Sequence, residues 1–336
     1  MKNPITIIGG GLFGLGLANG LRQFGVPVLL LEANSYPRHR VCGEFISGLS
    51  DQTLKMLGIG HCLDDALPHN STAWYRQGKC VRRYELPHPA RGISRFTLDA
   101  RLATKVIESG GRLQTYTRAT LTPESGHVIG TGRRTNHRGM YGLKSHWGNL
   151  ETEADLELHL GRGAYLGISK VEGGFTNTCG LFTSMAEGSF GSPLKRFLAT
   201  LADHGLGYLL PRLKTATHRE GSFCSVSGLA YHPSAGTGFG DHRQLIPPFT
   251  GHGMTLALEA AETALPHLVN YAQGVISWHD FQTLSGQGLH RRHKGRYFRS
   301  RLLHPLILNP TLQAVTVAAA KCRLLPFDTL YKLTHS

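Results

Sequence analysis

The sequence lacks the cysteine patterns and the targeting signals that would place it outside the reducing interior of a cell. Its six cysteines form no C-x-x-C pair and stand in no group with histidines at zinc-binding spacing. Neither a disulfide framework nor a metal site is therefore expected. No signal peptide precedes the first apolar run. We expect a cytoplasmic protein, with its 336 residues forming one large domain or two interleaved ones.

Acidic residues are also scarce, since 22 aspartates and glutamates face 36 lysines and arginines and the formal charge is +14. This imbalance favours negatively charged partners. Long apolar runs are missing as well. The longest late stretch without charge, residues 302–320, contains His304, Asn309, Gln313 and two prolines. No membrane-spanning helix is expected from such a stretch.

Glycine, in contrast, is abundant, and the N-terminal segment ITIIGGGLFGLGLANGLRQFGVPVLLLEA arranges it in a pattern. A G-x-G-x-x-G spacing follows an apolar run at 5–8 and opens a helix expected over 12–24. A second buried strand is expected over 26–31, and Glu32 ends the segment. This order of strand, glycine turn, helix, strand and acid predicts a dinucleotide site. The alternative is a glycine-rich turn with a purely structural role.

Each position of the pattern has a physical task. Gly9 permits the sharp turn, Gly11 lets a pyrophosphate approach the backbone, and Gly14 lets the helix lie close to the strand. The first N–H groups of the helix would face the phosphates, and Glu32 would accept hydrogen bonds from a ribose. The residues expected at this part of the site are Gly9, Gly11, Leu12, Phe13, Gly14 and Glu32.

Three later segments carry a resemblance to a known family: PRHRVCGEFIS at 37–47, ISRFTLDARL at 93–102 and GDHRQLIPPFTGHGM at 240–254. In this order they resemble FAD-dependent oxidoreductases of the aromatic-hydroxylase, or group A flavoprotein monooxygenase, superfamily. The subset near geranylgeranyl reductases and flavin-dependent halogenases is the most similar. The resemblance covers roughly residues 1–285.

This resemblance implies an α/β fold with two interleaved domains and a tail. One is a Rossmann-type, GR2-like FAD-binding domain with a parallel sheet in βαβ order, and the other is an antiparallel-sheet substrate domain. The implied boundaries are 1–70, 92–138 and 222–285 for the FAD-binding domain, 71–91 and 139–221 for the substrate domain, and 286–336 for a basic helical C-terminal region.

The resemblance also implies cofactor contacts beyond the glycine turn. Asp241 would bind the ribitol of FAD, and Arg95 would contact its phosphate or adenosine end; a solvated arginine at a helix entry is the alternative for Arg95. Cys42 is expected as a small packed residue rather than a redox thiol. The full set implied around the pyrophosphate, ribitol and flavin ring is Arg40, Cys42, Gly43, Arg95, Gly240, Asp241, Pro248, Gly251, Gly253 and Met254.

Two residues are candidates for catalysis. Glu44 would shape the wall close to the flavin ring, and His242 stands where the family usually has alanine. A partly exposed loop histidine is the alternative for His242. Neither residue is obligatory, because the flavin itself carries the difficult chemistry.

The sequence departs from the family pattern at specific places. In VIGTGRRTN (128–136), Thr131 stands where many aromatic hydroxylases have the aspartate of a G-x-D-G segment, which puts direct NAD(P)H binding by that route in doubt. The W-x-W-x-I-P segment of tryptophan halogenases and the Tyr-x-Trp-x-Phe-Pro segment of prenyl reductases are absent. Both of those activities are therefore less favoured.

The expected function is an FAD-dependent monooxygenase that hydroxylates or epoxidises an apolar, lipid-like or carrier-bound substrate. One alternative is an FAD-dependent reductase of carbon–carbon double bonds, similar to geranylgeranyl reductases. Another is a non-catalytic FAD-binding protein at a membrane. NAD(P)H or a separate reductase would supply electrons.

The middle of the chain alternates apolar and polar residues, with two strands expected around Gly78 and an antiparallel sheet over 140–185. Lys144 and His146, two apart on one strand face, are either a catalytic pair or an exposed face. Apolar and aromatic residues of this region could be core or could line a substrate pocket, and the candidates are Trp74, Tyr75, Trp147, Tyr165 and Phe182.

The end of the chain changes character. Residues 289–305 are rich in arginine and lysine, and an apolar, proline-broken tail follows. This pattern suits contact with anionic lipid through residues 289–336, or docking of an acidic acyl carrier protein. A solvated helix face with a core-packing tail is the alternative. No nucleic-acid partner is expected, because no known nucleic-acid module accompanies the basic stretch.

Overall fold

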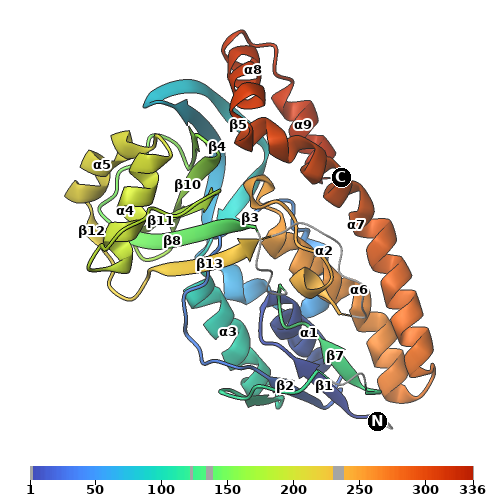
Figure 1. Cartoon of the computed structure of the whole chain (residues 1–336). Coiled ribbons are helices and arrows are strands. Elements are labelled where there is room, and N and C mark those ends of the chain that lie inside the picture. The colour runs from blue at the N-terminus through green and yellow to red at the C-terminus, as the bar shows by residue number, and fades with distance from the viewer. Residues whose placement is uncertain (1–2, 122–123, 134–138, 230–237, 336) are drawn as a thin grey trace.

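The computed structural model describes residues 3–121, 124–133, 139–229 and 238–335. Figure 1 shows a small parallel sheet in the lower part of the molecule and a larger sheet above it. The C-terminal helices run along the right-hand side of this view and across its top. The chain passes between the two sheets more than once, as expected for interleaved domains.

The parallel sheet has the strand order β6-β2-β1-β7. Ile7 of β1 and Leu30 of β2 are fully buried, because helices pack against the sheet. The strand–turn–helix–strand unit predicted from the glycine spacing is confirmed, although β2 starts two residues later than expected. The elements are β1 (Ile5–Ile8), α1 (Leu12–Gln23), β2 (Val28–Leu31), α3 (Arg95–Glu108), β6 (Arg112–Gln114) and β7 (His127–Ile129).

The larger sheet has the order β12-β8-β11-β10-β9-β4-β5-β3, with β13 also paired to β8. Its pairings are antiparallel except between β4 and β9. The antiparallel sheet predicted for 140–185 is confirmed. The strands are β3 (Phe45–Ile46), β4 (Leu67–Arg76), β5 (Lys79–Gly92), β8 (Met140–Gly148), β9 (Leu156–Gly161), β10 (Ala164–Val171), β11 (Phe175–Phe182), β12 (Thr217–His218) and β13 (Cys224–Leu229).

The pairings of this sheet differ in detail from the boundaries expected from the sequence. Strand β13 pairs with β8, although residues 222–285 were assigned to the FAD-binding domain. Strand β4 begins at Leu67, before the expected start of the substrate domain at residue 71, and β3 joins the same sheet. Hydrogen bonding across strands distant in sequence decides these memberships, and a local pattern does not report it.

Helices connect and cover the two sheets. The short ones are η1 (Gly60–Leu63), η2 (Gly207–Leu209), η3 (Gly240–His242), η4 (Pro248–Thr250), α2 (Asp51–Leu57) and α5 (Leu210–Thr215). The longer ones are α4 (Pro193–Asp203), α6 (Gly253–Gln273), α7 (Trp278–Leu308), α8 (Pro310–Lys321) and α9 (Phe327–His335).

Small residues let α6 approach α1 closely. A Cβ added at Gly16 would lie 3.1 Å from a methyl of Leu258, and one added at Gly20 would lie 2.8 Å from a methyl of Leu265. Larger side chains at these positions would push the helices apart. The close contact fixes the axis of α6 and with it the position of the N-terminus of α6.

Two hydrophobic clusters confirm which predicted residues are core. Leu98, Leu102 and Val106 lie on one face of α3 and are buried in the cluster around the parallel sheet. Trp147 and Phe182 belong instead to a cluster between the larger sheet and α4. These two aromatic residues are therefore core rather than pocket residues.

The C-terminal helices change direction sharply. Asn309 ends α7 and caps α8 by accepting hydrogen bonds from Thr311 N and Leu312 N, while Pro310 occupies the first turn of α8. Within the described residues, no single helix is long and apolar enough to cross a membrane. Helices α7 and α8 reach that length and composition only as a pair, and they are bent by 94°.

Candidate functional site

A cavity of about 1430 Å³ opens between the parallel sheet, the larger sheet and the C-terminal helices. Every residue predicted to contact the cofactor lines this cavity except Gly14. Gly14 lies behind the wall, where an added Cβ would meet the carbonyl oxygen of Gly9 at 2.0 Å. This contact is the close approach of helix to strand that the sequence predicts for Gly14.

The glycine turn leaves the start of α1 open toward the cavity. Gly9 has φ +110°, and a Cβ there would lie 2.4 Å from the carbonyl oxygen of Gly130. At Gly11 an added Cβ would meet nothing within 4 Å. Among the described residues no side chain caps α1, and Gly11, Leu12 and Phe13 line the cavity. Uncapped N–H groups at a helix N-terminus favour an anionic ligand such as a pyrophosphate.

Glu32 is held as an acceptor at the edge of the cavity. Its carboxylate accepts hydrogen bonds from Gly10 N at 2.8 Å and from Asn34 N and Nδ2 at 3.0 and 2.9 Å. Burial alone would raise the pKa of Glu32, but these bonds and the nearby Arg40 lower it below its usual value. The carboxylate therefore stays ionised and can accept further bonds from a ribose.

Two arginines of the predicted site are oriented by one buried acid. Asp99 accepts from Arg40 Nε at 3.0 Å and from Arg95 Nε and Nη2 at 2.7 and 2.8 Å. Burial alone would lower the pKa of Arg95, but Asp99 outweighs it and raises the pKa. Arg95 is thus a fixed cation at the cavity wall, and the alternative of a solvated helix-entry arginine is wrong.

Two further arginines face the same region of the cavity. Arg38 and Arg133 line the cavity, and Arg38 Nε and Arg133 Nη1 are buried without a hydrogen-bond partner among the described atoms. Buried donors of this kind are costly unless a ligand or water completes them. Together with the open start of α1, they fit the pyrophosphate and adenosine end of FAD.

Asp241, on η3, lines the cavity, and its side chain is exposed there. Burial raises its pKa to about 6, and Arg95 and Arg133 only partly oppose this rise. Because the carboxylate faces the open cavity, water screens part of the effect. A ligand hydroxyl that donates to Asp241 would favour its ionised form.

We therefore expect Asp241→Asn to stabilise the FAD-free protein at pH 7.5 but to weaken FAD binding. A pKa raised in the folded state adds stability below the unfolded pKa, and this contribution is lost as pH rises through about 6. The gain over wild type should therefore shrink toward pH 4. Urea denaturation at both pH values and FAD titration measure the two effects. An unchanged FAD affinity would contradict the ribitol assignment.

The opposite part of the cavity wall is built around the turn before α6. Gly251 has φ +72°, and a Cβ there would lie 2.2 Å from the ring of Phe45. At Gly253, the first residue of α6, an added Cβ would meet nothing within 4 Å. Pro248 begins the short helix η4, and Met254 is buried. The N-terminus of α6, with its partial positive charge, therefore lies at this wall.

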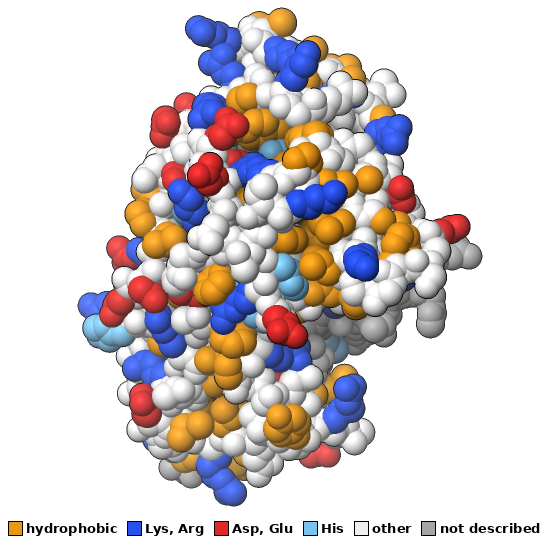
Figure 2. All heavy atoms as spheres, turned by 90° about the vertical axis from the view of Figure 1, so that its left-hand side faces the viewer, with side chains coloured by type: hydrophobic (Ala, Val, Ile, Leu, Met, Phe, Trp, Pro, Cys, Tyr) orange, Lys and Arg blue, Asp and Glu red, His pale blue; other side chains and the backbone are white. Residues whose placement is uncertain are grey.

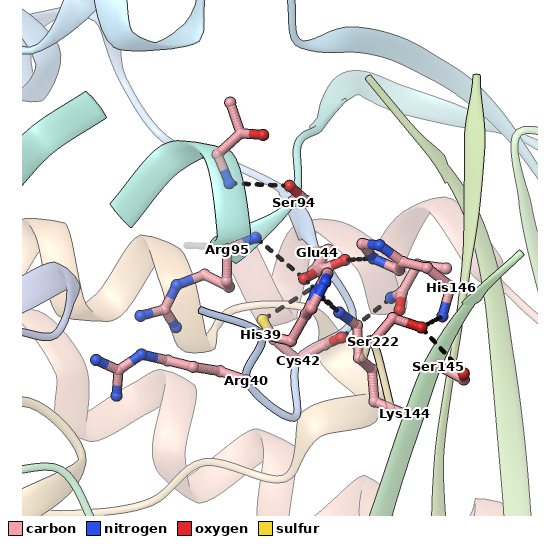
Figure 3. Close-up of polar contacts among 12 residues, drawn as sticks. His39, Arg40, Cys42, Glu44, Ser94, Arg95, Lys144, Ser145, His146 and Ser222 are labelled. Atoms are coloured by element: carbon pink, nitrogen blue, oxygen red, sulfur yellow. Dashed lines mark hydrogen bonds and ion pairs between the residues drawn. The ribbon is translucent and has the colours of Figure 1, made fainter. Parts of the chain in front are cut away.

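Behind the wall lies a buried polar cluster (Figure 3). Glu44 is fully buried and has φ +58°, which is rare outside glycine. Its carboxylate accepts from Lys144 Nζ at 3.1 Å, from Arg95 N at 3.0 Å and from His146 Nε2. Lys144 Nζ also lies 2.9 Å from Nδ1 of His39, which lines the cavity. The cluster thus links loop 37–47 to strand β8.

The burial of this cluster corrects one expectation. Lys144 and His146 are both fully buried, so the alternative of an exposed strand face is wrong. Strand β8 is covered on both faces, and alternation along it does not separate core from solvent. Glu44 itself does not line the cavity. Burial alone would raise the pKa of Glu44, but Lys144 and His146 outweigh it and lower the pKa.

The same atoms have the spacing of a metal site. One nitrogen each of His39 and His146 and an oxygen of Glu44 lie within 4.8 Å of one another. However, the Lys144 ammonium lies at 2.9 Å from His39 and 3.1 Å from Glu44. A cation is therefore already placed among these groups. Lys144 also leaves His39 an acceptor at Nδ1, and burial followed by Lys144 lowers the pKa of His39 to about 3.

Two other sequence expectations concern Cys42 and His242. Burial raises the pKa of the Cys42 thiol, and no disulfide forms among the described cysteines. Cys42 is half-buried and lines the cavity, so its role as a small packed residue stays a prediction. His242 lines the cavity but is buried, and its Nδ1 lies 2.9 Å from Thr131 Oγ1. The alternative of a partly exposed loop histidine is wrong.

The apolar end of the cavity combines predicted and unpredicted residues. Trp74 and Tyr165 line it, as the sequence suggested, whereas Tyr75 instead stacks on His159 at 4.6 Å. Sequence reasoning missed the contribution of the C-terminal helices. Phe327 of α9 stacks on Tyr84 at 4.1 Å. The missed lining residues include Phe249, Leu303, Leu306, Phe327, Leu330 and Tyr331.

No motif marks the residues that sequence reasoning missed. They reach the cavity because Tyr331 Oη lies 2.7 Å from Ser47 Oγ and because Gln313 Nε2 donates to Gly161 O at 3.0 Å. Both contacts join residues more than 150 positions apart. The only indication in the sequence is the apolar C-terminal tail. It predicts that the tail packs on the protein, but it does not identify the surface that the tail covers.

No family model matches the chain, and no curated protein matches its sequence. Solved structures are similar in fold. Flavin-dependent brominase Bmp2 has 16% identity, a TM-score of 0.76 and coverage of 100% of this chain and 94% of its own. For p-nitrophenol 4-monooxygenase PnpA from Pseudomonas putida DLL-E4, the values are 11%, 0.77, 99% and 96%.

A third similar structure is PqsL, a probable FAD-dependent monooxygenase from Pseudomonas aeruginosa, with 13% identity and a TM-score of 0.69. The match covers 94% of this chain and 99% of that one. The similarity to all three covers at least 94% of this chain. The chain therefore has the α/β fold shared by flavin-dependent monooxygenases and a flavin-dependent brominase, as the sequence resemblance implied.

Proposed function

We propose that the chain is an FAD-dependent oxidoreductase, and more narrowly a monooxygenase acting on an apolar substrate. One observation carries this proposal: residues from four separate segments, predicted as cofactor contacts, line a single cavity. The open start of α1 and the buried donors Arg38 Nε and Arg133 Nη1, which have no hydrogen-bond partner among the described atoms, support an anionic ligand. The acceptors Glu32 and Asp241 support a ligand that also carries hydroxyl groups.

When bound, FAD would supply redox chemistry with dioxygen, and the chain's own residues would do the rest. Arg95, fixed by Asp99, would hold the phosphate or adenosine end. Asp241 would accept from the ribitol, and Gly251 and Gly253 would let the backbone approach the ring. The partial charge at the N-terminus of α6 would favour negative charge on the ring.

The substrate would occupy the apolar end of the cavity. Its walls carry large apolar side chains from the larger sheet, from η4 and from the C-terminal helices, including Trp74, Leu86, Phe249, Leu303, Leu306 and Phe327. Such walls exclude water and position an apolar group, which are the tasks left to the protein in this chemistry. A lipid-like molecule or the apolar part of a carrier-bound group fits this lining.

The first test is an anaerobic titration of the purified protein, supplied with FAD, with NADPH and then NADH. We expect a yellow protein whose flavin band bleaches and returns on admission of oxygen. A yellow protein that bleaches only with dithionite would require a separate reductase as electron donor. A protein that takes up no FAD would contradict the proposal.

Product mass then separates the two reactions. A monooxygenase adds one oxygen atom and needs dioxygen, whereas a reductase of carbon–carbon double bonds adds two hydrogens and works without it. Candidate substrates are long-chain polyenes and hydrophobic phenols, with the Gly11→Ala variant as a control that should bind little FAD. A gain of two hydrogens without oxygen would replace the monooxygenase proposal with the reductase.

A further inference from the structure

The outward faces of α7 and α8 carry large apolar side chains that nothing in the described structure covers. Phe298 and Leu302 lie four residues apart on α7, on the side opposite to its buried Ser300. Val315 lies on the outer side of α8, and Leu324 follows the end of that helix. Their exposed fractions are 68% for Phe298, 65% for Leu302, 64% for Val315 and 75% for Leu324.

Cationic side chains accompany these residues. Lys294 and Arg301 are exposed on α7 and lie within a turn of Phe298, while Lys321 and Arg323 are exposed beside Leu324. From residue 286 to the end the sequence has nine lysines and arginines and a single acid, Asp328. Figure 2 shows basic and hydrophobic side chains together at the upper end of the molecule, where α8 lies, with acidic ones below.

Not every cation of α7 is available for a partner. Arg292 lies 2.7 Å from Glu262, and Arg296 lies 2.6 Å from Glu259, so both pair with acids of α6. These two arginines attach α7 to the body of the protein. For the exposed cations beside the apolar residues, no ion pair with another described residue is found, so they are available to an external partner.

We propose that this outer surface of α7 and α8 binds an anionic phospholipid bilayer. Apolar side chains flanked by lysine and arginine insert at the boundary of headgroups and acyl chains, while the cations meet lipid phosphates. A second copy of the chain is a poor occupant, because the same cations would face each other. An acidic protein would satisfy the charges, but the exposed apolar residues spread over two helices bent by 94° suit a deformable surface better.

The inner side of the same helices connects this surface with the cavity. This part of the inference rests on the proposed function. Leu303 and Leu306 of α7 and Thr316 of α8 line the cavity. Leu303 directly follows Leu302, which is exposed. The helices therefore separate an apolar cavity from an apolar, cationic outer surface. Docking on lipid would let an apolar substrate enter from the bilayer without crossing water.

The test is sedimentation of the full chain, supplied with FAD, with vesicles of equal parts phosphatidylglycerol and phosphatidylcholine. We expect binding that weakens with salt and that is at least about tenfold weaker for pure phosphatidylcholine. Phe298→Ser with Leu302→Ser, and separately Lys294→Glu with Arg301→Glu, should each weaken binding by about tenfold or more. The matched control is Ile107→Ser, an exposed apolar residue of α3 at the other end of the molecule.

Flavin absorbance in the same samples keeps the two proposals apart. A yellow protein that does not sediment with anionic vesicles overturns membrane docking and leaves the proposed function intact. Equal binding by wild type and both double variants also overturns the assignment of this surface. If an acyl carrier protein is retained and vesicles are not, the partner is an acidic protein and lipid is excluded.

Discussion

Gly11→Ala is expected to lower the affinity for FAD by about tenfold or more, or about 1.4 kcal/mol, without loss of stability. In the structure Gly11 has φ −85° and ψ −175°, which any residue can adopt, and an added Cβ meets no protein atom within 4 Å. The methyl group would occupy the space through which a pyrophosphate approaches the start of α1. Loss of glycine entropy in the unfolded chain would even add slight stability.

Gly14→Ala should behave differently, because its Cβ would lie 2.0 Å from the carbonyl oxygen of Gly9. Strand β1 and helix α1 would have to separate, so both the melting temperature and FAD retention should fall. Gly60→Ala is the matched control, since Gly60 is exposed and an added Cβ there also meets nothing within 4 Å. Equilibrium dialysis of FAD and thermal denaturation measure both quantities. If Gly11→Ala bound FAD like wild type, the pyrophosphate would have to lie elsewhere.

The contrast between these glycines explains why this part of the site could be predicted from the sequence. The glycine turn is local: strand, turn and helix follow within about twenty residues, and each glycine answers a nearby contact. Asp241 was predicted by a different signal, the resemblance of residues 240–254 to a family segment. Nothing local links Asp241 to Gly11, and only the fold shows that both line one cavity.

The residues that the sequence could not predict lie where the fold buries a strand or a helix by contacts between distant segments. Alternation along β8 was consistent with a solvated face for Lys144 and His146, because charged residues are almost never fully buried unless paired. Their partner, Glu44, lies about one hundred positions earlier. The aromatic residues of α9 at the cavity were missed for a similar reason, since no spacing in the sequence relates Phe327 to Tyr84.

The second large effect is expected on stability, when the ion pair between Lys144 and Glu44 is broken. Lys144→Met should lower the free energy of unfolding by about 3–5 kcal/mol at pH 7.5, because Glu44 would remain buried with its main positive partner removed. Methionine keeps most of the volume of lysine, so a cavity contributes little. Urea denaturation of the FAD-free protein measures this loss. Arg301→Met, on the exposed face of α7, is the control and should change stability by less than about 0.5 kcal/mol.

A double variant distinguishes the effect of charge from the effect of packing. Adding Glu44→Gln to Lys144→Met removes the unpaired carboxylate and should recover a large part of the loss, because Gln still accepts from Arg95 N. A double variant as unstable as the sum of both single variants would indicate packing instead.

The pH dependence has a definite sign. Lys144 and His146 lower the pKa of Glu44 in wild type, so this contribution to stability is present above the unfolded pKa and lost as pH falls through the folded value. Without Lys144 burial dominates, and Glu44 would gain a proton on folding. The difference in stability between wild type and Lys144→Met should therefore narrow from pH 7.5 to pH 4. A difference that stays constant over this range would mean that Glu44 is not the group left unpaired.

The Glu44 carboxylate also accepts a hydrogen bond from the backbone N–H of Arg95 at the cavity wall. The Lys144→Met variant should therefore also bind FAD less tightly.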